Sequence, residues 1–286
     1  NIKSIGLIKK YEQKIRPENS ITYIKNLPNI SILHTGGTIS SKVSYETGAV
    51  EPKFSPEDIL EKFPEIREIA NIKSRLIYNM LSSNMRFHHY NIISKEIEKE
   101  LKHNVKGIII THGTDTIHYT SAALSFILEN IHIPVILVGA QRSSDRPSTD
   151  AAQNLIHAVK FIIQTDFKGV AVCMHASLND STSIIMHPCK MRKLHTSRRD
   201  AFKPINTSPI ATINEKIDFL IKNHHSNEEF KLKPINVKIK VGILKIHPNL
   251  YASEINNYRN FDALILEGTG LGHAPVEKID KNSSEN

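Results

Sequence analysis

Short apolar segments alternate with helix-length amphipathic segments from Ile30 to about Phe202, and this alternation restricts the possible folds more than any other feature. Several of the apolar segments contain β-branched runs, such as Ile108-Ile109-Ile110, which are typical of strands buried on both faces. Strands that alternate with helices form parallel βαβ units. We therefore predict an α/β domain whose mostly parallel sheet is flanked by helices, with strands at residues 30–34, 75–80, 106–112, 134–138 and 168–174.

Two of the intervening segments carry helix signals. Ser55 supplies an N-cap hydroxyl, Pro56 suits the first helical position, and Glu57 and Asp58 place acids in the first turn. Residues 151–163 place their large apolar side chains on one stripe, as a helix against a sheet requires. Sheets of this kind bind ligands at the carboxyl ends of their strands, so we expect the functional residues there.

The composition of the chain changes along its length, and these changes predict four parts. Residues 1–29 scatter lysines among isoleucines before a Leu-Pro-Asn break, so we expect the end of an upstream module and a linker. Residues 30–210 form the predicted catalytic domain, and the polar, irregular residues 211–236 are expected to be a linker. Residues 237–286 are expected to be a smaller, truncated α/β domain, with strands at 237–246 and 262–266.

The overall composition narrows the class of protein. Hydrophobic residues make up 40% of the 286 residues, and no apolar run approaches the roughly 20 residues of a membrane span. Because no signal peptide is evident and only Cys173 and Cys189 are present, we expect a reduced cytoplasmic protein without a membrane segment. The formal net charge of +8 favours polyanionic partners such as nucleic acid, or reflects a proteome rich in lysine.

Two of the predicted strands end in motifs that combine glycine with hydroxyl groups. The first strand is followed by Thr35-Gly36-Gly37-Thr38-Ile39 and the third by His112-Gly113-Thr114-Asp115-Thr116. Glycine lets backbone amides approach a ligand closely beside an exposed hydroxyl. A plain glycine turn would explain either motif alone, and the spacing of a phosphate-binding loop is absent from the first. Two strand ends of one sheet therefore each offer a threonine.

Together and in this order, the two motifs resemble the signature motifs of the asparaginase/glutaminase family. The resemblance implies a flavodoxin-like N-terminal α/β domain, a smaller C-terminal domain, and active sites formed between the subunits of a tight homodimer. Three segments are similar, more specifically, to the D subunits of archaeal glutamyl-tRNA(Gln) amidotransferases: Ser44–Val50, Arg192–Phe202 and Glu267–His273. Those subunits carry a small β-barrel module ahead of the asparaginase domain, and residues 1–25 resemble its end, with a linker up to residue 29.

The resemblance also implies roles for individual residues. Thr38 is the expected nucleophile, and Thr114, Asp115 and Lys193 are the expected set of groups that move protons. A further group is expected to contact the substrate, with a serine at the position where the family binds the α-carboxylate and a tyrosine on the loop after the nucleophile. This substrate-binding group consists of Gly37, Tyr45, Ser82, Ser83 and Gly113.

The implied reaction is hydrolysis of the glutamine side-chain amide in two steps. A threonine hydroxyl is a poor nucleophile at neutral pH, so a base is needed, and a neutral Lys193 suits that role. Attack releases ammonia and leaves an ester, which water then hydrolyses to glutamate. Which of Thr38 and Thr114 attacks first stays open, as does the choice for Asp115 between proton transfer and binding of the substrate ammonium group.

The resemblance implies partners but no cofactor in this subunit. The expected partners are glutamine, a second copy of the chain, the E subunit of the amidotransferase, and tRNA(Gln) through the complex. The E subunit would use ATP and Mg to convert Glu-tRNA(Gln) to Gln-tRNA(Gln). The cluster of Arg192, Arg198 and Arg199 either lies near these partners or forms a solvated face with internal ion pairs.

Several rival functions remain to be weighed. A free-standing L-asparaginase/glutaminase would share the fold, and an inactive tRNA-assembly scaffold would have no need for the threonine, aspartate and lysine set. The 15 histidines raise the possibility of a metal hydrolase, but no H-E-x-x-H or similar spacing occurs, and we expect no metal. The Gly268–Gly272 run lacks the final glycine and the following helix of a dinucleotide site.

Overall fold

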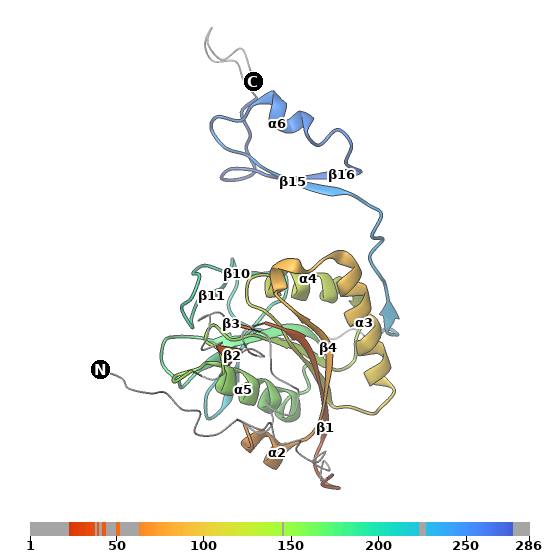
Figure 1. The fold of residues 1–286 in the computed structure, drawn as a ribbon, viewed down its shortest axis with the longest axis vertical. Coiled ribbons are helices and arrows are strands. Elements are labelled where there is room, and N and C mark those ends of the chain that lie inside the picture. The colour runs from red at the N-terminus through yellow and green to blue at the C-terminus, as the bar shows by residue number, and fades with distance from the viewer. Residues whose placement is uncertain are drawn as a thin grey trace, which may run out of the picture.

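The computed structural model describes residues 23–37, 39, 42–43, 50–51, 63–144, 146–222 and 227–276. An eight-stranded sheet forms the centre of the larger domain (Figure 1). Five neighbouring strands of this sheet are parallel, and three antiparallel strands extend it at one side. In spatial order the strands are β13 (Ile217–Phe219), β12 (Ala211–Ile213), β9 (Ser183–Met186), β8 (Gly169–His175), β7 (Pro134–Val138), β5 (Gly107–Thr111), β1 (Asn29–Gly36) and β4 (Asn71–Met80).

Helices cover both faces of the sheet, because successive residues of the buried strands point to opposite faces. Ile109 of β5 packs in one core with α5 (Ala151–Gln164) and α2 (Glu65–Ile69). Its neighbours Ile108 and Ile110 pack in the second core with α3 (Phe87–Leu101) and α4 (Ile117–Ile127). All three isoleucines are fully buried, and burial of such a side chain contributes about 1.5–3 kcal/mol.

The architecture confirms the predicted fold class, including the five predicted parallel strands and the helix after residue 150. The helix predicted after Ser55 lies outside the described residues. None of the helices in the described part of the chain has the length and apolar character needed to span a bilayer.

The expected linker at residues 211–236 is replaced in part by strands. β12 pairs with β9, and β13 pairs with β12, so the sheet continues to Phe219. Ala211 and Ile213 are fully buried, which gives this hairpin a place in the core. Two three-residue strands around a polar turn carry too little periodicity to be recognised from sequence. Farther along, β14 (Lys231–Leu232) pairs with β6 (Leu128–Glu129) beside α4.

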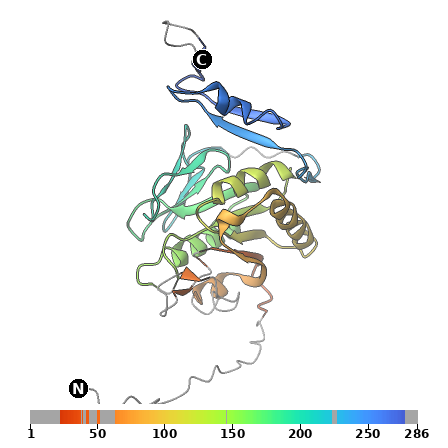
Figure 2. The same cartoon turned by 45° about the horizontal axis from the view of Figure 1, so that its top comes forward.

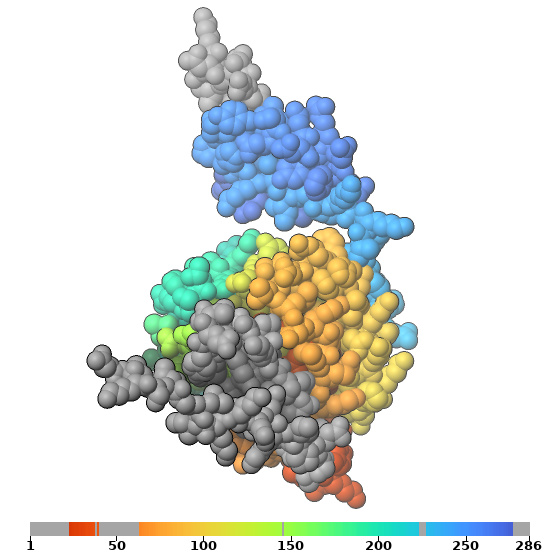
Figure 3. All heavy atoms as spheres, in the orientation of Figure 1, coloured from red at the N-terminus to blue at the C-terminus, as the bar shows by residue number. Residues whose placement is uncertain are grey.

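Small hairpins and a second unit complete the described chain. β2 (Lys42–Val43) pairs with β3 (Val50–Glu51), and β10 (Met191–Lys193) pairs with β11 (Phe202–Pro204). The second unit contains the parallel strands β15 (Val241–Lys245) and β16 (Ala263–Glu267), connected through α6 (Ala252–Asn256). Its two strands lie within the two segments predicted for them, apart from the last residue of β16. Figures 1, 2 and 3 show this unit in blue, joined to the larger domain by an extended segment.

Two asparagine side chains fasten the segments that enter and leave the larger domain. Asn71, the first residue of β4, donates to the carbonyl oxygens of Ile24 at 2.9 Å and Leu27 at 3.0 Å, and it accepts from the Ile24 amide at 2.9 Å. Asn91 on α3 donates to the carbonyl oxygen of Ile235 and accepts from its amide, both at 2.8 Å. Each amide side chain therefore fixes a chain segment that has no regular secondary structure of its own.

Candidate active site

The carboxyl ends of three parallel strands meet at one edge of the sheet. His34 of β1 is in register with Thr111 of β5, which is in turn in register with Val138 of β7. The glycine and hydroxyl motifs that follow β1 and β5 therefore leave the sheet side by side. This edge is where an open parallel sheet binds its ligands.

The two glycine motifs touch through their backbones. Gly37 has a φ of +83°, which is a left-handed conformation that favours glycine. A Cβ atom on Gly37 would lie 2.4 Å from the Cα of Gly113, so a side chain there would force one of the two backbones to move. The expected nucleophile Thr38 lies outside the described residues, as does Tyr45, but the residue directly before Thr38 contacts the second motif.

Thr114, Asp115 and Lys193 come together at this edge. The Nζ atom of Lys193 donates to Oγ1 of Thr114 at 2.8 Å and to Oδ1 of Asp115 at 2.8 Å. Thr114 is 6% exposed and the Lys193 side chain 12%, whereas the Asp115 side chain is 72% exposed. The amine and the hydroxyl are thus shielded from water, while most of the carboxylate is exposed.

Lys193 reaches the site from a separate hairpin rather than from the parallel sheet. It is the last residue of β10 and pairs with Phe202, the first residue of β11. Phe202 is fully buried, and its ring belongs to the core shared with α3 and α4. The hydrophobic anchor at Phe202 therefore positions the strand from which the amine extends.

The two serines predicted to bind substrate lie beside the second glycine motif. Ser82 begins a short 3-10 turn, Ser82–Asn84, and is 5% exposed. A Cβ atom on Gly113 would lie 2.7 Å from Oγ of Ser82, and Thr116 Oγ1 donates to the Ser82 carbonyl oxygen at 2.7 Å. Ser83 is exposed on the same turn. The turn is thus held against the loop that carries Thr114 and Asp115.

Two buried histidines support the strand ends. His34 lies between Oγ1 of Thr111, at 2.8 Å from Nδ1, and Oγ of Ser74, at 2.7 Å from Nε2. His112 donates from Nδ1 to the Gly113 carbonyl oxygen at 2.8 Å, and its Nε2 lies 2.8 Å from Oγ1 of Thr120. Burial lowers the pKa of each imidazole to about 4, so both rings are neutral at neutral pH. Their role at the site is to hold backbone and hydroxyl groups in place.

Asp150 organises the loop that follows β7. Its carboxylate accepts hydrogen bonds from the amide of Gln141, at 2.9 and 3.0 Å, and from the amide of Arg142 at 2.9 Å. Gln141 in turn donates to the carbonyl oxygen of Arg198 at 2.8 Å, which connects this loop to the β10–β11 hairpin. Sequence reasoning missed Asp150, although an acid directly before a predicted helix is a recognisable signal.

The predicted arginine cluster is largely engaged in internal ion pairs. Arg198 binds Asp200 through two nitrogens, at 2.9 and 3.0 Å, and Arg199 binds Asp180. Arg192 is exposed. These contacts favour the interpretation of a charged face stabilised within the chain for two of the three arginines.

Two rival site types were considered from sequence. Within the described residues, no group of three histidine, cysteine, aspartate or glutamate side chains is placed to hold a metal ion. The glycine run after β16 forms a tight turn in which the Thr269 amide donates to the His273 carbonyl oxygen at 2.9 Å.

A comparison with models of protein families identifies the family to which the chain belongs. The family model described as "Asparaginase, N-terminal" matches residues 29–225, which is more than half of the chain. The chain belongs to the asparaginase family. The asparaginase match ends after β13, which agrees with the extension of the sheet beyond residue 210.

Solved asparaginases have the same fold. The chain is similar to the thermostable L-asparaginase from Thermococcus kodakarensis, with a TM-score of 0.77 and 31% identity over 86% of this chain and 73% of that one. It is also similar to L-asparaginase I from Vibrio cholerae, with a TM-score of 0.77 and 27% identity over 88% of this chain and 75% of that one.

Curated relatives within the asparaginase family are D subunits of glutamyl-tRNA(Gln) amidotransferase. The subunit from Methanococcus vannielii is 48% identical over 259 residues, which are 87% of this chain and 60% of the relative. The subunit from Pyrococcus furiosus is 44% identical over 285 residues, which are 97% of this chain and 65% of the relative. The chain thus spans less than two thirds of the length of these relatives.

Proposed function

We propose that the protein is the glutaminase subunit of a glutamyl-tRNA(Gln) amidotransferase and releases ammonia from glutamine through a threonine nucleophile. The observation that carries this proposal is the pair of 2.8 Å contacts from Lys193 Nζ to Thr114 Oγ1 and to Asp115 Oδ1. A buried hydroxyl, an amine and a carboxylate in one line form a path for a proton. The sequence identity to the D subunits supports glutamine as the proposed substrate and an amidotransferase subunit as the proposed partner.

The proposed reaction proceeds through a covalent ester. The Thr38 hydroxyl oxygen bonds to the amide carbon of glutamine, and its proton passes to the set formed by Thr114, Lys193 and Asp115. The tetrahedral intermediate collapses when that proton reaches the amide nitrogen, which leaves as ammonia. Water then attacks the ester, returns a proton to the Thr38 oxygen and releases glutamate. Backbone amides near Gly37 and Thr114 are the proposed donors to the oxyanion.

Ser82 is the proposed contact of the substrate α-carboxylate. Further proposed contacts of the substrate are Ser83, Tyr45, Gly37 and Gly113. Ser82 packs against Gly113 and next to the loop of Asp115, so a bound amino acid would have hydroxyl groups on one side and a carboxylate on the other. Asp115 has the exposure needed to bind the substrate ammonium group as well as to contact Lys193.

The proposed assembly contains a homodimer of this subunit and an E subunit, in the cytoplasm. This subunit would need no cofactor of its own, and the E subunit would use ATP and Mg to activate Glu-tRNA(Gln) before ammonia converts it to Gln-tRNA(Gln). tRNA(Gln) would be bound through the complex. The relatives' printed names, which describe an amidotransferase subunit, support the partner assignment.

The decisive experiment measures ammonia release from glutamine and from asparagine by the full-length protein, with and without the E subunit and Glu-tRNA(Gln). We expect glutamine hydrolysis that rises strongly when both are added. Brisk hydrolysis of asparagine by the protein alone would instead assign it as a free-standing L-asparaginase/glutaminase, which is the second candidate because solved L-asparaginases share its fold.

A further inference from the structure

Thr114 and Lys193 come from different parts of the fold, so their 2.8 Å contact depends on how those parts are held together. Thr114 follows β5 of the central sheet, whereas Lys193 ends β10 of the separate hairpin. A misplacement of about 1 Å between catalytic groups can lower a rate by about 100-fold. A contact that fixes the lysine end of the hairpin on the sheet would therefore affect turnover without touching the substrate.

The loop between β10 and β11 connects Lys193 to Arg199 through short backbone contacts. The amide of Leu194, the residue after Lys193, donates to the carbonyl oxygen of Ala201 at 2.7 Å. Ala201 is 2% exposed, and its own amide donates to the Arg198 carbonyl oxygen at 3.1 Å. Arg199 lies between these two carbonyl groups in the sequence. A displacement of Arg199 is therefore passed through Ala201 to the strand end that carries Lys193.

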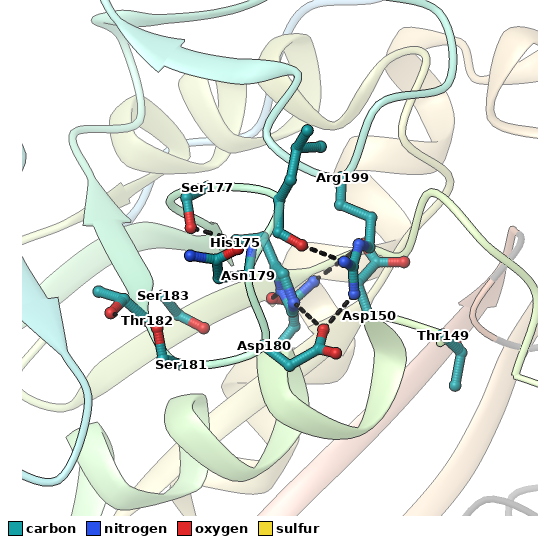
Figure 4. A network of polar contacts seen from close by, with 12 residues as sticks. Thr149, Asp150, His175, Ser177, Asn179, Asp180, Ser181, Thr182, Ser183 and Arg199 are labelled. Carbon is teal, nitrogen blue, oxygen red and sulfur yellow. Dashed lines mark hydrogen bonds and ion pairs between the residues drawn. The ribbon is translucent and has the colours of Figure 1, made fainter. Parts of the chain in front are cut away.

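Arg199 fastens this loop to the loop that follows β8, and Figure 4 shows its contacts. The guanidinium donates to the carboxylate of Asp180 and to the carbonyl oxygen of Leu178, and the Arg199 side chain is 14% exposed. Hydrogen bonds from a charged donor are about twice as strong as those between neutral groups. Lys203 of β11 adds a contact to the same loop by donating to the Ala176 carbonyl oxygen at 3.2 Å. Two cationic side chains thus hold the hairpin against the β8–β9 loop.

The β8–β9 loop is in turn fixed to the part of the fold that positions Thr114. β8 pairs with β7 and β7 with β5, so this loop and the segment of Thr114 leave the same sheet. The Ala176 amide donates to the Thr182 carbonyl oxygen at 3.0 Å and closes the base of the loop. In the orientation that satisfies both of its polar groups, the Gln153 side chain on α5 donates to the Asp180 carbonyl oxygen at 2.7 Å and accepts from the Thr182 amide at 3.0 Å.

The neighbouring Arg198 makes an ion pair of a different kind. Its guanidinium binds the carboxylate of Asp200 at 2.9 and 3.0 Å, and its side chain is 51% exposed. Exposed ion pairs contribute little to stability. Because both partners belong to the same hairpin loop, this pair cannot hold the loop against another part of the fold. Two consecutive arginines of one loop therefore differ in whether they connect it to the sheet.

We propose that Arg199 is a positioning residue that docks the β10–β11 hairpin on the β8–β9 loop and thereby keeps Lys193 aligned with Thr114. The kinetic part of this inference rests on the proposed function, because alignment is measured as a rate of turnover. The structural part does not, because it concerns the hairpin itself. Arg199 acts through the backbone of the hairpin and exchanges no proton with the substrate.

The experiment compares four variants of the full-length protein, assayed with the E subunit and Glu-tRNA(Gln). Arg199→Met removes the guanidinium, Asp180→Ala removes the carboxylate on the other side of the contact, and a third variant combines the two changes. Arg198→Met is the matched control, because it removes the same chemical group from the adjacent position. For each variant, kcat and KM for glutamine are measured below the thermal midpoint, together with the amide hydrogen exchange of residues 191–204.

We expect Arg199→Met to lower kcat by about 10-fold with little change in KM, because alignment rather than binding is lost. Asp180→Ala should also lower kcat, and exchange in residues 191–204 should accelerate in both variants. The double variant should be no slower than the slower single variant, since both substitutions break one contact. Arg198→Met should behave as the wild type in both measurements.

Three results would overturn the inference. The first is wild-type kcat and exchange in Arg199→Met, and the second is an equal loss in Arg198→Met, which would indicate a general effect of charge or stability. The third is a double variant in which the two losses of kcat multiply, because Arg199 and Asp180 would then act independently. Absence of glutaminase activity in the wild type would instead refute the proposed function, and the exchange measurement would still decide whether Arg199 holds the hairpin.

Discussion

Gly37 and Gly113 lie so close that a Cβ atom on Gly37 would be 2.4 Å from the Cα of Gly113. The contact joins the ends of β1 and β5 at the point where the expected nucleophile follows. The neighbouring side of Gly113 is filled by Ser82, at 2.7 Å from a Cβ on Gly113. Two backbones and a serine turn are therefore packed against one another without space for a methyl group.

Gly37→Ala is expected to abolish activity and to lower the free energy of unfolding by about 1–3 kcal/mol, through backbone strain at φ +83° and a clash with Gly113. Gly169→Ala separates the two causes. Gly169 has φ +119°, but the nearest atom to a Cβ there is 3.8 Å away, so this variant should lose stability and keep activity. Urea unfolding and ammonia release measure both effects, and a fully active Gly37→Ala protein would contradict the site.

Removal of the hydroxyl or the amine at the proton-handling set should stop turnover without unfolding the chain. Thr114→Val and Lys193→Met are each expected to lower kcat by about 100-fold or more. Lys190→Met, on the exposed turn before β10, is the control and should keep wild-type turnover. Glutamine hydrolysis is measured beside the thermal midpoint, and a Lys193→Met variant with a normal rate would remove the lysine from the mechanism.

Thr38→Ala is expected to abolish ammonia release and to leave the fold and any dimer intact. The reason is chemical, since the methyl group of alanine cannot form the ester intermediate. Circular dichroism and the sedimentation velocity of the full-length protein provide the structural comparison. Residual turnover above a few per cent would transfer the nucleophilic role to another residue, with Thr114 the first to test.

Acid should destabilise the protein before its carboxylates titrate. The pKa of buried His34 and His112 is about 4 in the folded protein, against 6.5 for an exposed imidazole. The unfolded chain therefore takes up more protons between these values, so stability is complete above about pH 6.5 and falls as the pH is lowered toward 4. Each histidine contributes at most about 3 kcal/mol to this loss.

The same dependence can be assigned to one residue by substitution. Urea unfolding of His34→Asn between pH 7 and 4 should show a shallower slope than the wild type, whatever its absolute stability. His132→Asn, a change at an exposed histidine, should leave the slope unchanged. Equal slopes for all three proteins would show that His34 takes up its proton normally when folded.

Asn71→Ala should release the segment that leads into β1. The substitution removes three hydrogen bonds to Ile24 and Leu27, and limited proteolysis around residues 23–28 should become faster than in the wild type. Asn91→Ala provides the reciprocal control, because it should expose the segment around Ile235 instead. Cleavage at the same site in both variants would show that Asn71 and Asn91 do not each hold a separate segment.

Much of the fold was predictable because parallel strands buried on both faces have long β-branched runs and the helices between them have amphipathic stripes. The Ile108–Ile110 run and the 151–163 segment are examples, and both are confirmed. The β12–β13 hairpin was not predicted, because three-residue strands at the side of a sheet carry almost no periodic signal. Its place is determined by pairing with β9, which is a tertiary contact.

Part of the site was predictable because two motifs that combine glycine with threonine can be recognised at the ends of predicted strands. The approach of Lys193 to Thr114 and Asp115 agrees with the set named from sequence, although the two sides are separated by 78 or 79 residues. Their individual roles stay predictions. Asp150 was overlooked, although an acid directly before a predicted helix can be recognised; its contacts with the backbone amides of Gln141 and Arg142 arise only from the fold.

The amine of Lys193 sits on a hairpin that is structurally separate from the parallel sheet, and this separation has an evolutionary consequence. A lineage could lose the hairpin's alignment through one insertion or deletion between Lys193 and Phe202 and still keep every layer of the domain. On the proposed function, such a descendant would keep the sheet edge and its two glycine motifs but lose the amine that turnover requires.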